Sequence, residues 1–216
     1  MIIAVDGPAA SGKGTLGRRL ARHFGLAFLD TGGLYRAVAL RVLNAGGDPA
    51  DAAAAEAAAR AVSAGDLADP RLRAEGVSQA ASVVAAMPGV RQALLAFQRD
   101  FARHPPGDEP GAVLDGRDIG TVICPDADAK LFITATPEAR AARRTRELRE
   151  RGEPAIYEAV LQDMKDRDAR DSQRRTAPLV PADDAFVLDT TALDADAAFA
   201  AALAFISRKL AARPPS

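Results

Sequence analysis

The first fifteen residues read Met1-Ile2-Ile3-Ala4-Val5-Asp6-Gly7-Pro8-Ala9-Ala10-Ser11-Gly12-Lys13-Gly14-Thr15. They begin with a short apolar run that is typical of a strand and continue as a glycine-rich segment. Leu16, Leu20 and Phe24 then recur at helical spacing. A strand, a glycine-rich loop and a helix in this order predict an anion cradle, because successive backbone N–H groups at a helix N-terminus point at a bound phosphate.

The loop fits the phosphate-loop pattern G-x4-G-K at Gly7, Gly12 and Lys13. Lys13 is expected to reach the outer phosphates of a nucleotide. Gly14 stands where the pattern has Ser or Thr, and the hydroxyl follows one position later as Thr15. We therefore assign no direct hydroxyl ligand to magnesium and expect Thr15 to contact phosphate or a metal-bound water.

Apolar runs and helical patterns alternate along the rest of the chain. The runs predicted as strands are 26–29, 112–115, 130–134 and 185–188, and the segments predicted as helices include 51–64, 77–87 and 88–104. A loop is expected at 63–73, and Thr31 is expected to cap a helix. This alternation predicts an α/β fold with a mainly parallel sheet covered by helices on both faces, which binds ligands at the carboxyl ends of its strands.

Composition excludes several classes of protein. The 216 residues carry 28 basic and 29 acidic side chains, so no excess of positive charge favours binding to long nucleic acid. The single cysteine, Cys124, excludes an intramolecular disulfide, and no apolar run approaches the length of a membrane helix. We expect a cytoplasmic chain with no nucleic-acid or membrane partner and a single domain.

The basic residues are unevenly divided, because four of the 28 are lysine and the other 24 are arginine. Arg167, Arg170, Asp171 and Arg174 recur at helical spacing and are expected to share one helical face. Planar guanidinium groups opposite a phosphate loop would neutralise the charge that develops in phosphoryl transfer. Asp115, at the end of an apolar run, is a candidate to orient magnesium or its waters.

Longer blocks of sequence resemble one family. The GKGT of the loop resembles the nucleoside monophosphate kinases. The segments 29–36 (LDTGGLYR), 112–122 (AVLDGRDIGTV) and 167–179, which ends in APL, resemble bacterial cytidylate kinase. The resemblance covers nearly the whole chain and implies transfer of phosphate from ATP to CMP or dCMP with Mg²⁺, in a P-loop fold that acts as a monomer.

The resemblance also implies a role for individual residues. The donor ATP would be held by Gly7, Pro8, Ala9, Ala10, Ser11, Gly12, Lys13, Gly14 and Thr15. The acceptor's phosphate would be bound by Arg36, Arg117 and Arg174, with Lys13, Arg117 and Arg174 as the catalytic set. Cytosine would be read by Ser82, Arg91 and Asp118. Arg167 and Asp171 would lie near the pentose, Thr31 and Tyr35 would line the acceptor site, and Arg144 and Arg170 would belong to a mobile lid.

The same resemblance predicts the organisation of the chain and shows one departure from the family. The expected parts are a core (1–30, 111–138 and 176–216), a monophosphate-binding lobe (31–110) and a lid (139–175). Many bacterial relatives carry a strand-rich insert in that lobe, whereas residues 65–77 have no alternating pattern here, so a helical lobe is predicted. Two alternatives remain at this point: a kinase for another acceptor, such as AMP, UMP or shikimate, and a nonenzymatic nucleotide-dependent switch.

Overall fold

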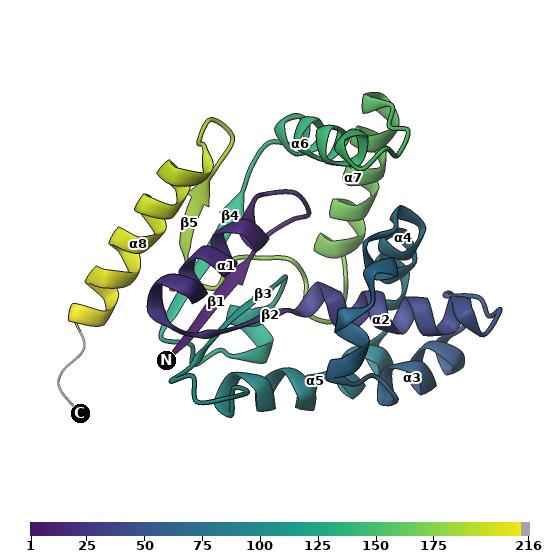
Figure 1. The fold of residues 1–216 in the computed structure, drawn as a ribbon, viewed down its shortest axis with the longest axis horizontal. Coiled ribbons are helices and arrows are strands. Elements are labelled where there is room, and N and C mark those ends of the chain that lie inside the picture. Colours follow the sequence, from purple (N-terminus) through teal and green to yellow (C-terminus); the bar gives the residue numbers. More distant parts are fainter. Residues whose placement is uncertain (213–216) are drawn as a thin grey trace. The chain divides into compact units, whose positions relative to one another are not determined.

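The computed structural model describes residues 1–212, in which helices and strands alternate along the chain (Figure 1). The strands are β1 (Ile2–Asp6), β2 (Ala27–Asp30), β3 (Ala112–Gly116), β4 (Ala129–Thr134) and β5 (Phe186–Asp189). The α-helices are α1 (Lys13–Phe24), α2 (Thr31–Asn44), α3 (Ala52–Arg60), α4 (Glu75–Val84), α5 (Pro88–Arg103), α6 (Pro137–Glu150), α7 (Tyr157–Ser172) and α8 (Ala195–Ala211). Shorter turns are the 3-10 helices η1 (Ala64–Ala68) and η2 (Pro70–Arg73) and the π-helical turn η3 (Ile119–Ile123).

The strands form one sheet in the order β2-β3-β1-β4-β5. The pairs β1–β3, β1–β4 and β4–β5 are parallel, with Ile2 beside Ala112 and Ile3 beside Ala129. The chain first builds the sheet on one side of β1 and then continues on the other side, so the loop after β1 lies at the switch point where such sheets bind ligands. The predicted α/β fold with a parallel sheet is confirmed.

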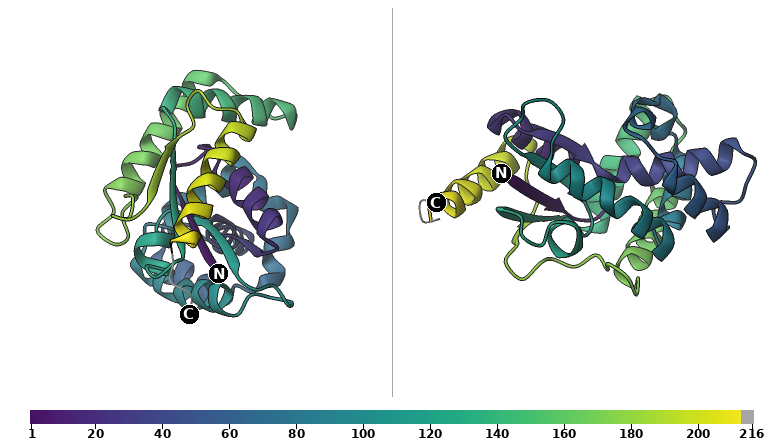
Figure 2. Two further views of the ribbon diagram at one scale, coloured as in Figure 1. Left: turned by 90° about the vertical axis from the view of Figure 1, so that its left-hand side faces the viewer. Right: turned by 90° about the horizontal axis from the view of Figure 1, so that it is seen from below.

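The main apolar core lies between the sheet and the helices α1 and α8, which are on the same side of the strands (Figure 2). β1 contributes Ile3 and Val5 to this core, and α8 contributes Ile206. Because side chains alternate along a strand, Ala4 and Asp6 point to the opposite face. There the turn η3 packs against β1 and β3. The alternation of β1 therefore directs the carboxylate of Asp6 toward η3.

The contacts divide the chain into two units. Unit 1 consists of Met1–Leu29 and the chain from Ala102 onward, and it contains most of the sheet. Unit 2 is Asp30–Phe101, in which α2 packs against α3, α4, η1 and η2. Apart from Asp30, the last residue of β2, every regular element of unit 2 is an α-helix or a 3-10 turn, as predicted from the lack of an alternating pattern.

Two local expectations were wrong. Asp30, not Thr31, caps α2: its carboxylate accepts the N–H of Gly33 at 3.3 Å, and Thr31 is already the first helical residue. The expected loop at 63–73 forms η1 and η2 instead. Asp66 closes a capping box with Ser63 there, and a further aspartate side chain caps η2. Short polar residues that signal a loop thus serve as caps.

The predicted helices of unit 2 agree with α3, α4 and α5 to within a few residues at each end. Within residues 1–212, no single helix is long and apolar enough to cross a membrane, although α4 and α5, bent by 101° at their break, reach that length and hydropathy together.

Candidate active site

The loop between β1 and α1 has a backbone that requires glycine at two positions. Gly7 has a φ of 147°, and a Cβ there would lie 2.0 Å from the carbonyl oxygen of Ile133. Gly12, the N-cap of α1, has a φ of 91° and offers no side chain to cap the helix. The N-terminal N–H groups of α1 therefore face the interior of the loop, as an anion cradle requires.

Lys13 is held inside this loop. Its side chain is buried, and its Nζ donates to the carbonyl oxygen of Pro8 at 3.2 Å. The same Nζ lies 3.8 Å from Oδ1 of Asp115, which is near the carboxyl end of β3. The ammonium group is thus already placed where the loop would receive phosphate, with a carboxylate next to it.

Asp115 explains the departure of the loop from the common phosphate-loop pattern. The residue is buried, and a Cβ at position 14 would lie 3.0 Å from its Oδ2. Glycine avoids this close approach, and any larger residue at position 14 would press on the carboxylate. Thr15, one position later, is exposed and lines a pocket beside the loop.

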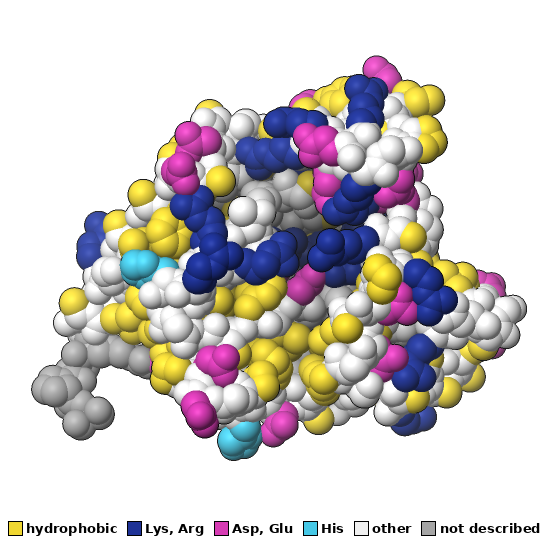
Figure 3. All heavy atoms as spheres, in the orientation of Figure 1, with side chains coloured by type: hydrophobic (Ala, Val, Ile, Leu, Met, Phe, Trp, Pro, Cys, Tyr) yellow, Lys and Arg dark blue, Asp and Glu magenta, His cyan; other side chains and the backbone are white. Residues whose placement is uncertain are grey.

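A pocket of about 470 Å³ lies beside the loop in unit 1. It is lined by Ser11, Gly12, Thr15, Leu16, Ile133, Arg143, Arg146, Glu147, Glu150, Thr190, Leu193, Asp194, Ala195 and Ala198. Thr190 connects its walls, because its Oγ1 donates to the carbonyl oxygen of Ser11 at 2.9 Å and accepts from Arg143 at 3.1 Å. Lys and Arg side chains, dark blue in Figure 3, gather around a hollow beside α6 and α7.

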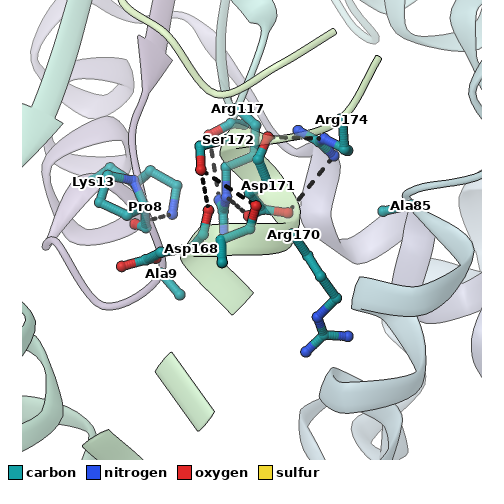
Figure 4. Close-up of polar contacts among 12 residues, drawn as sticks. Pro8, Ala9, Lys13, Ala85, Arg117, Asp168, Arg170, Asp171, Ser172 and Arg174 are labelled. Atoms are coloured by element: carbon teal, nitrogen blue, oxygen red, sulfur yellow. Dashed lines mark hydrogen bonds and ion pairs between the residues drawn. The ribbon is translucent and has the colours of Figure 1, made fainter. Parts of the chain in front are cut away.

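Asp171 of α7 joins two arginines in unit 1 (Figure 4). Its Oδ2 accepts the Nε–H of Arg117 at 2.9 Å, and its Oδ1 lies 3.7 Å from a guanidinium nitrogen of Arg174. Arg174 also donates its Nε–H to the backbone oxygen of Asp171 at 3.2 Å. The carboxylate fixes the two planar groups relative to each other, and the excess of positive charge leaves a site suited to an anion.

The protonation of this cluster is determined by a competition between burial and charge. Burial by itself would raise the pKa of the Asp171 carboxyl, but Arg117, Arg174 and Arg167 outweigh it and hold that pKa below its ordinary value. Burial by itself would lower the pKa of Arg117, but the nearby carboxylates, chiefly that of Asp171, together have the larger effect, so the pKa of Arg117 is raised above its ordinary value. The ion pair is therefore fully charged at neutral pH.

Arg140 is a functional candidate that the sequence analysis missed. Its side chain is 3% exposed and donates to the carbonyl oxygens of Ala135 (2.9 Å) and Ala9 (3.3 Å) as well as to Asp168 (3.2 Å). It thus connects α6, the phosphate loop and α7. One signal was present in the sequence, because Arg140 lies on the helical face that buries Ala141 and its apolar neighbours.

The expected face of α7 is only partly formed. Arg174 lies beyond the helix, which ends at Ser172, yet it still reaches Asp171. Arg170 is exposed and points away from the cluster (Figure 4). Arg144, the other expected lid residue, pairs with Glu147 of its own helix at 3.0 Å. Arg117, from the turn after β3, takes the place in the cluster that spacing had suggested for Arg170.

Unit 2 holds a second group of predicted residues. The guanidinium carbon of Arg91 lies 5.5 Å from the ring centre of Tyr35, and an Arg91 nitrogen donates to the carbonyl oxygen of Ala85 at 3.2 Å. Both side chains are buried. Ser82, on α4, is also buried, and its Oγ has no hydrogen-bond partner within the described chain. A buried hydroxyl without a partner is costly unless a ligand supplies one.

Arg36 and Thr31 belong to the start of α2 in the same unit. An Arg36 nitrogen donates to Oδ2 of Asp30 at 2.6 Å, so the residue that caps the helix also orients the arginine. Arg36 is half-buried and Thr31 is buried.

The structure therefore assembles the predicted site residues in two groups. Unit 1 brings together the phosphate loop, Asp115, Arg117, Asp171 and Arg174, and unit 2 contains Thr31, Tyr35, Arg36, Ser82 and Arg91. Asp118 and Arg167 also belong to unit 1, where both are at least half-buried. Among the described residues, no group of three His, Cys, Asp or Glu side chains could hold a metal ion on its own.

The matching family model and the sequence relatives agree on one family. A model of the cytidylate kinase family matches residues 3–208. A cytidylate kinase of Paramagnetospirillum magneticum strain AMB-1 is 62% identical over 208 residues, which cover 96% of this chain and 98% of that one. A cytidylate kinase of Methylocella silvestris is 61% identical over 206 residues, 95% and 94% of the two chains. Among solved structures, an uncharacterized protein from Eubacterium ventriosum has a similar fold, with a TM-score of 0.54, 17% identity and coverage of 96% and 98%.

Proposed function

We propose a role for each site residue from one premise: the chain belongs to the cytidylate kinase family, as a family match over residues 3–208 shows. The enzyme is therefore a phosphotransferase that uses ATP to convert CMP and dCMP to CDP and dCDP. The observation that carries the residue-level proposal is the cluster of Arg117 and Arg174 on Asp171, in the same unit as the phosphate loop. The phosphate loop would bind the donor nucleotide, and the cluster of Arg117 and Arg174 would bind the phosphate of the acceptor.

The donor ATP binds along the loop from Gly7 to Thr15. The N-terminus of α1 and the ammonium group of Lys13 face its outer phosphates. The pocket of about 470 Å³ beside Thr15 accommodates the rest of the nucleotide. Arg143 and Thr190, which are hydrogen-bonded to each other, line this pocket.

The acceptor is recognised through its phosphate and its base. Arg36, Arg117 and Arg174 bind the phosphate, for which forked guanidinium donors are well suited. Arg167 and Asp171 contact the pentose, and Thr31 and Tyr35 line the site.

Cytosine is read by Ser82, Arg91 and Asp118. A carboxylate accepts from the exocyclic amine, and an arginine donates to the ring carbonyl and N3. Two features of unit 2 support this: the hydroxyl of Ser82 is buried without a protein partner, and Arg91 is fixed over the ring of Tyr35.

Magnesium enters with ATP, and the donor set near the loop fits an ion held chiefly by phosphates and waters. Asp115 is a carboxylate beside Lys13, and Mg²⁺ typically keeps several waters with one or two carboxylates. Asp115 would hold the ion through a water. The ion would neutralise charge on the β- and γ-phosphates.

The reaction needs electrostatic compensation more than proton transfer. The second pKa of a phosphate monoester is about 6, so CMP is mostly a dianion at neutral pH and attacks without a general base. ATP, CMP and one Mg²⁺ together leave roughly four negative charges to compensate as the phosphates meet. Lys13, Arg36, Arg117 and Arg174 supply positive charge at that point. Water must be excluded, since it would otherwise accept the same phosphoryl group.

We assign the remaining properties on the same premise. Unit 2, Asp30–Phe101, acts as the monophosphate-binding lobe, and residues 139–175, with α6 and α7, act as the lid. The enzyme works as a monomer in the cytoplasm, where ATP and CMP are available, and it uses neither nucleic acid nor a membrane.

A panel of acceptors tests the substrate assignment. ADP release should be measured with CMP, dCMP, UMP, AMP and shikimate at equal concentrations. CMP and dCMP should give the highest kcat/KM. A higher value with another acceptor would overturn the reading of cytosine by Ser82, Arg91 and Asp118, and ATP binding without ADP release on any acceptor would favour a nucleotide-dependent switch.

A further inference from the structure

The carboxylate of Asp6, the last residue of β1, is buried and bonded to a distant segment. Its Oδ1 accepts the N–H of Ile119 and its Oδ2 accepts the N–H of Gly120, both at 2.8 Å. Each carboxylate oxygen thus holds one of the first two residues of η3. Asp118 comes directly before them as the N-cap of this turn, and Arg117 comes before Asp118.

The turn is also confined from its other side. A Cβ at Gly120 would lie 3.1 Å from the Cδ of Lys130 and 3.4 Å from Oδ2 of Asp6. Lys130 is itself fixed, because its Nζ bonds to Asp184 at 2.8 Å. Gly120 therefore occupies a narrow space between side chains of β1 and β4, and the start of η3 has little room to shift.

We propose that Asp6 is a positioning residue for the acceptor side of the reaction, which fixes Asp118 and Arg117 through the backbone of η3 even though it adjoins the loop that holds the donor. This inference rests on the proposed roles of Asp118 and Arg117 in CMP binding. In this role Asp6 acts through its hydrogen bonds to the backbone of η3 and not through a contact with either nucleotide.

The environment of Asp6 supports a functional reason for its presence. The pKa of the Asp6 carboxyl is raised to about 7, chiefly by burial and in smaller part by the nearby Asp118 and Asp115, while the two backbone N–H groups act to lower it. A carboxylate in such surroundings is unfavourable by itself. The hydrogen bonds that Asp6 accepts from η3 offset part of this cost, and they hold the segment that follows Arg117 and Asp118.

Asp6→Asn is the direct test. Asparagine keeps the shape but offers one acceptor oxygen, and it places an amide N–H group against one of the two backbone donors. Misplacement of binding groups by about 1 Å costs on the order of 100-fold in rate. We expect the KM for CMP to rise about 10- to 100-fold and the preference for CMP over UMP to fall, while the KM for ATP changes by less than about threefold.

Asp128→Asn is the matched control. The carboxylate of Asp128 accepts the N–H of Ile2 at 2.6 Å, so the same chemical change is made at the opposite end of the same strand. Both KM values should stay as in the wild type. The inference is overturned if Asp6→Asn raises the KM for ATP as much as that for CMP, or if it changes neither.

Two further variants separate this inference from the proposed function. Gly120→Ala places a methyl group close to the Asp6 carboxylate and so disturbs the same contact from the side of η3. If Asp6→Asn does not fold, Gly120→Ala should likewise raise the KM for CMP more than the KM for ATP. Asp118→Ala tests the acceptor role itself. Unchanged CMP kinetics in Asp118→Ala would refute the role of Asp118, whereas an impaired Asp118→Ala beside a normal Asp6→Asn would refute the role of Asp6. In the double variant, the two effects on base preference should be non-additive.

Discussion

A guanidinium nitrogen of Arg140 lies 3.3 Å from the carbonyl oxygen of Ala9, so helix α6 is hydrogen-bonded directly to the phosphate loop. The same guanidinium forms an ion pair with Asp168 of α7. A displacement of α6 or α7 would therefore shift the backbone of the loop that would hold the donor phosphates.

Arg140→Ala should destabilise the fold by about 3 kcal/mol, because it leaves Asp168 and two carbonyl oxygens without their donor. It should also raise the KM for ATP, since the loop loses its support at Ala9. Urea unfolding and steady-state kinetics measure the two effects. Arg151→Ala, which removes an exposed ion pair at the C-terminal end of the same helix, should change stability by less than about 0.5 kcal/mol. Equal stability of the two variants would contradict the bridging role of Arg140.

Lys13→Ala should lower kcat by about 100- to 1,000-fold, because it removes a buried positive charge from the transferring phosphate. Its stability should fall as well, because the buried carboxylate of Asp115 loses the ammonium group beside it. Lys209→Ala, a lysine on α8, serves as the control for kinetics. A kcat within about threefold of the wild type would refute the assignment.

Ser82→Ala should separate binding from stability. The Oγ of Ser82 is buried and has no hydrogen-bond partner within the described chain, so its removal should leave the free energy of unfolding unchanged or slightly higher. If the hydroxyl contacts cytosine, the KM for CMP should nevertheless rise about 5- to 20-fold, which corresponds to the loss of one hydrogen bond. Thermal unfolding together with CMP kinetics measures both, and an unchanged KM would remove Ser82 from the site.

Asp118→Ala should mainly raise the KM for CMP, by about 10- to 100-fold, and relax the choice of base, because the carboxylate that accepts from the exocyclic amine is lost. The value of kcat at saturating CMP should fall less. Competition between CMP and UMP in one reaction gives the preference directly. A preference identical to that of the wild type would contradict the reading of cytosine by this residue.

The stability contributed by Asp6 should fall as the pH rises. Its pKa increases from 3.8 to about 7 on folding, because burial disfavours the charged form. Between these values the folded chain holds a proton that the unfolded chain releases, so this contribution is complete below pH 3.8 and is lost as the pH rises through 7. The difference in unfolding free energy between wild type and Asp6→Asn should therefore decline from pH 4 to pH 8, by at most about 1.4 kcal/mol per pH unit. A constant difference would contradict the raised pKa.

The strands and the phosphate loop were predictable because their signals are local. An apolar run of four or five residues followed by glycine predicts β1 and its loop without reference to the rest of the chain. The arginine cluster was predictable in part, since Arg174 and Asp171 are close in sequence. Arg117 was assigned by resemblance to the family, and its partner lies 54 residues away.

What the sequence did not reveal depends on contacts between distant segments. The partners of Asp6 lie 113 and 114 residues away, and the loop carbonyl that Arg140 reaches lies 131 residues away. Composition indicated an exposed, charge-rich α6, and nothing in its local pattern distinguishes the buried Arg140 from its exposed neighbours except its place on the apolar face. The outward direction of Arg170 was missed for the same reason. Helical spacing shows which residues share one face of a helix, but it does not show what that face packs against.

The central position of β1 has a consequence for the order in which the protein is made. Both neighbours of β1 come late, since β3 begins at Ala112 and β4 at Ala129. At a synthesis rate of about 5–20 residues per second, the first strand waits several seconds for any partner in the sheet. The contiguous unit Asp30–Phe101 is complete before then. The apolar segment Ile2–Val5 therefore stays without a partner strand, and open to association with other chains, until β3 and β4 have been synthesised.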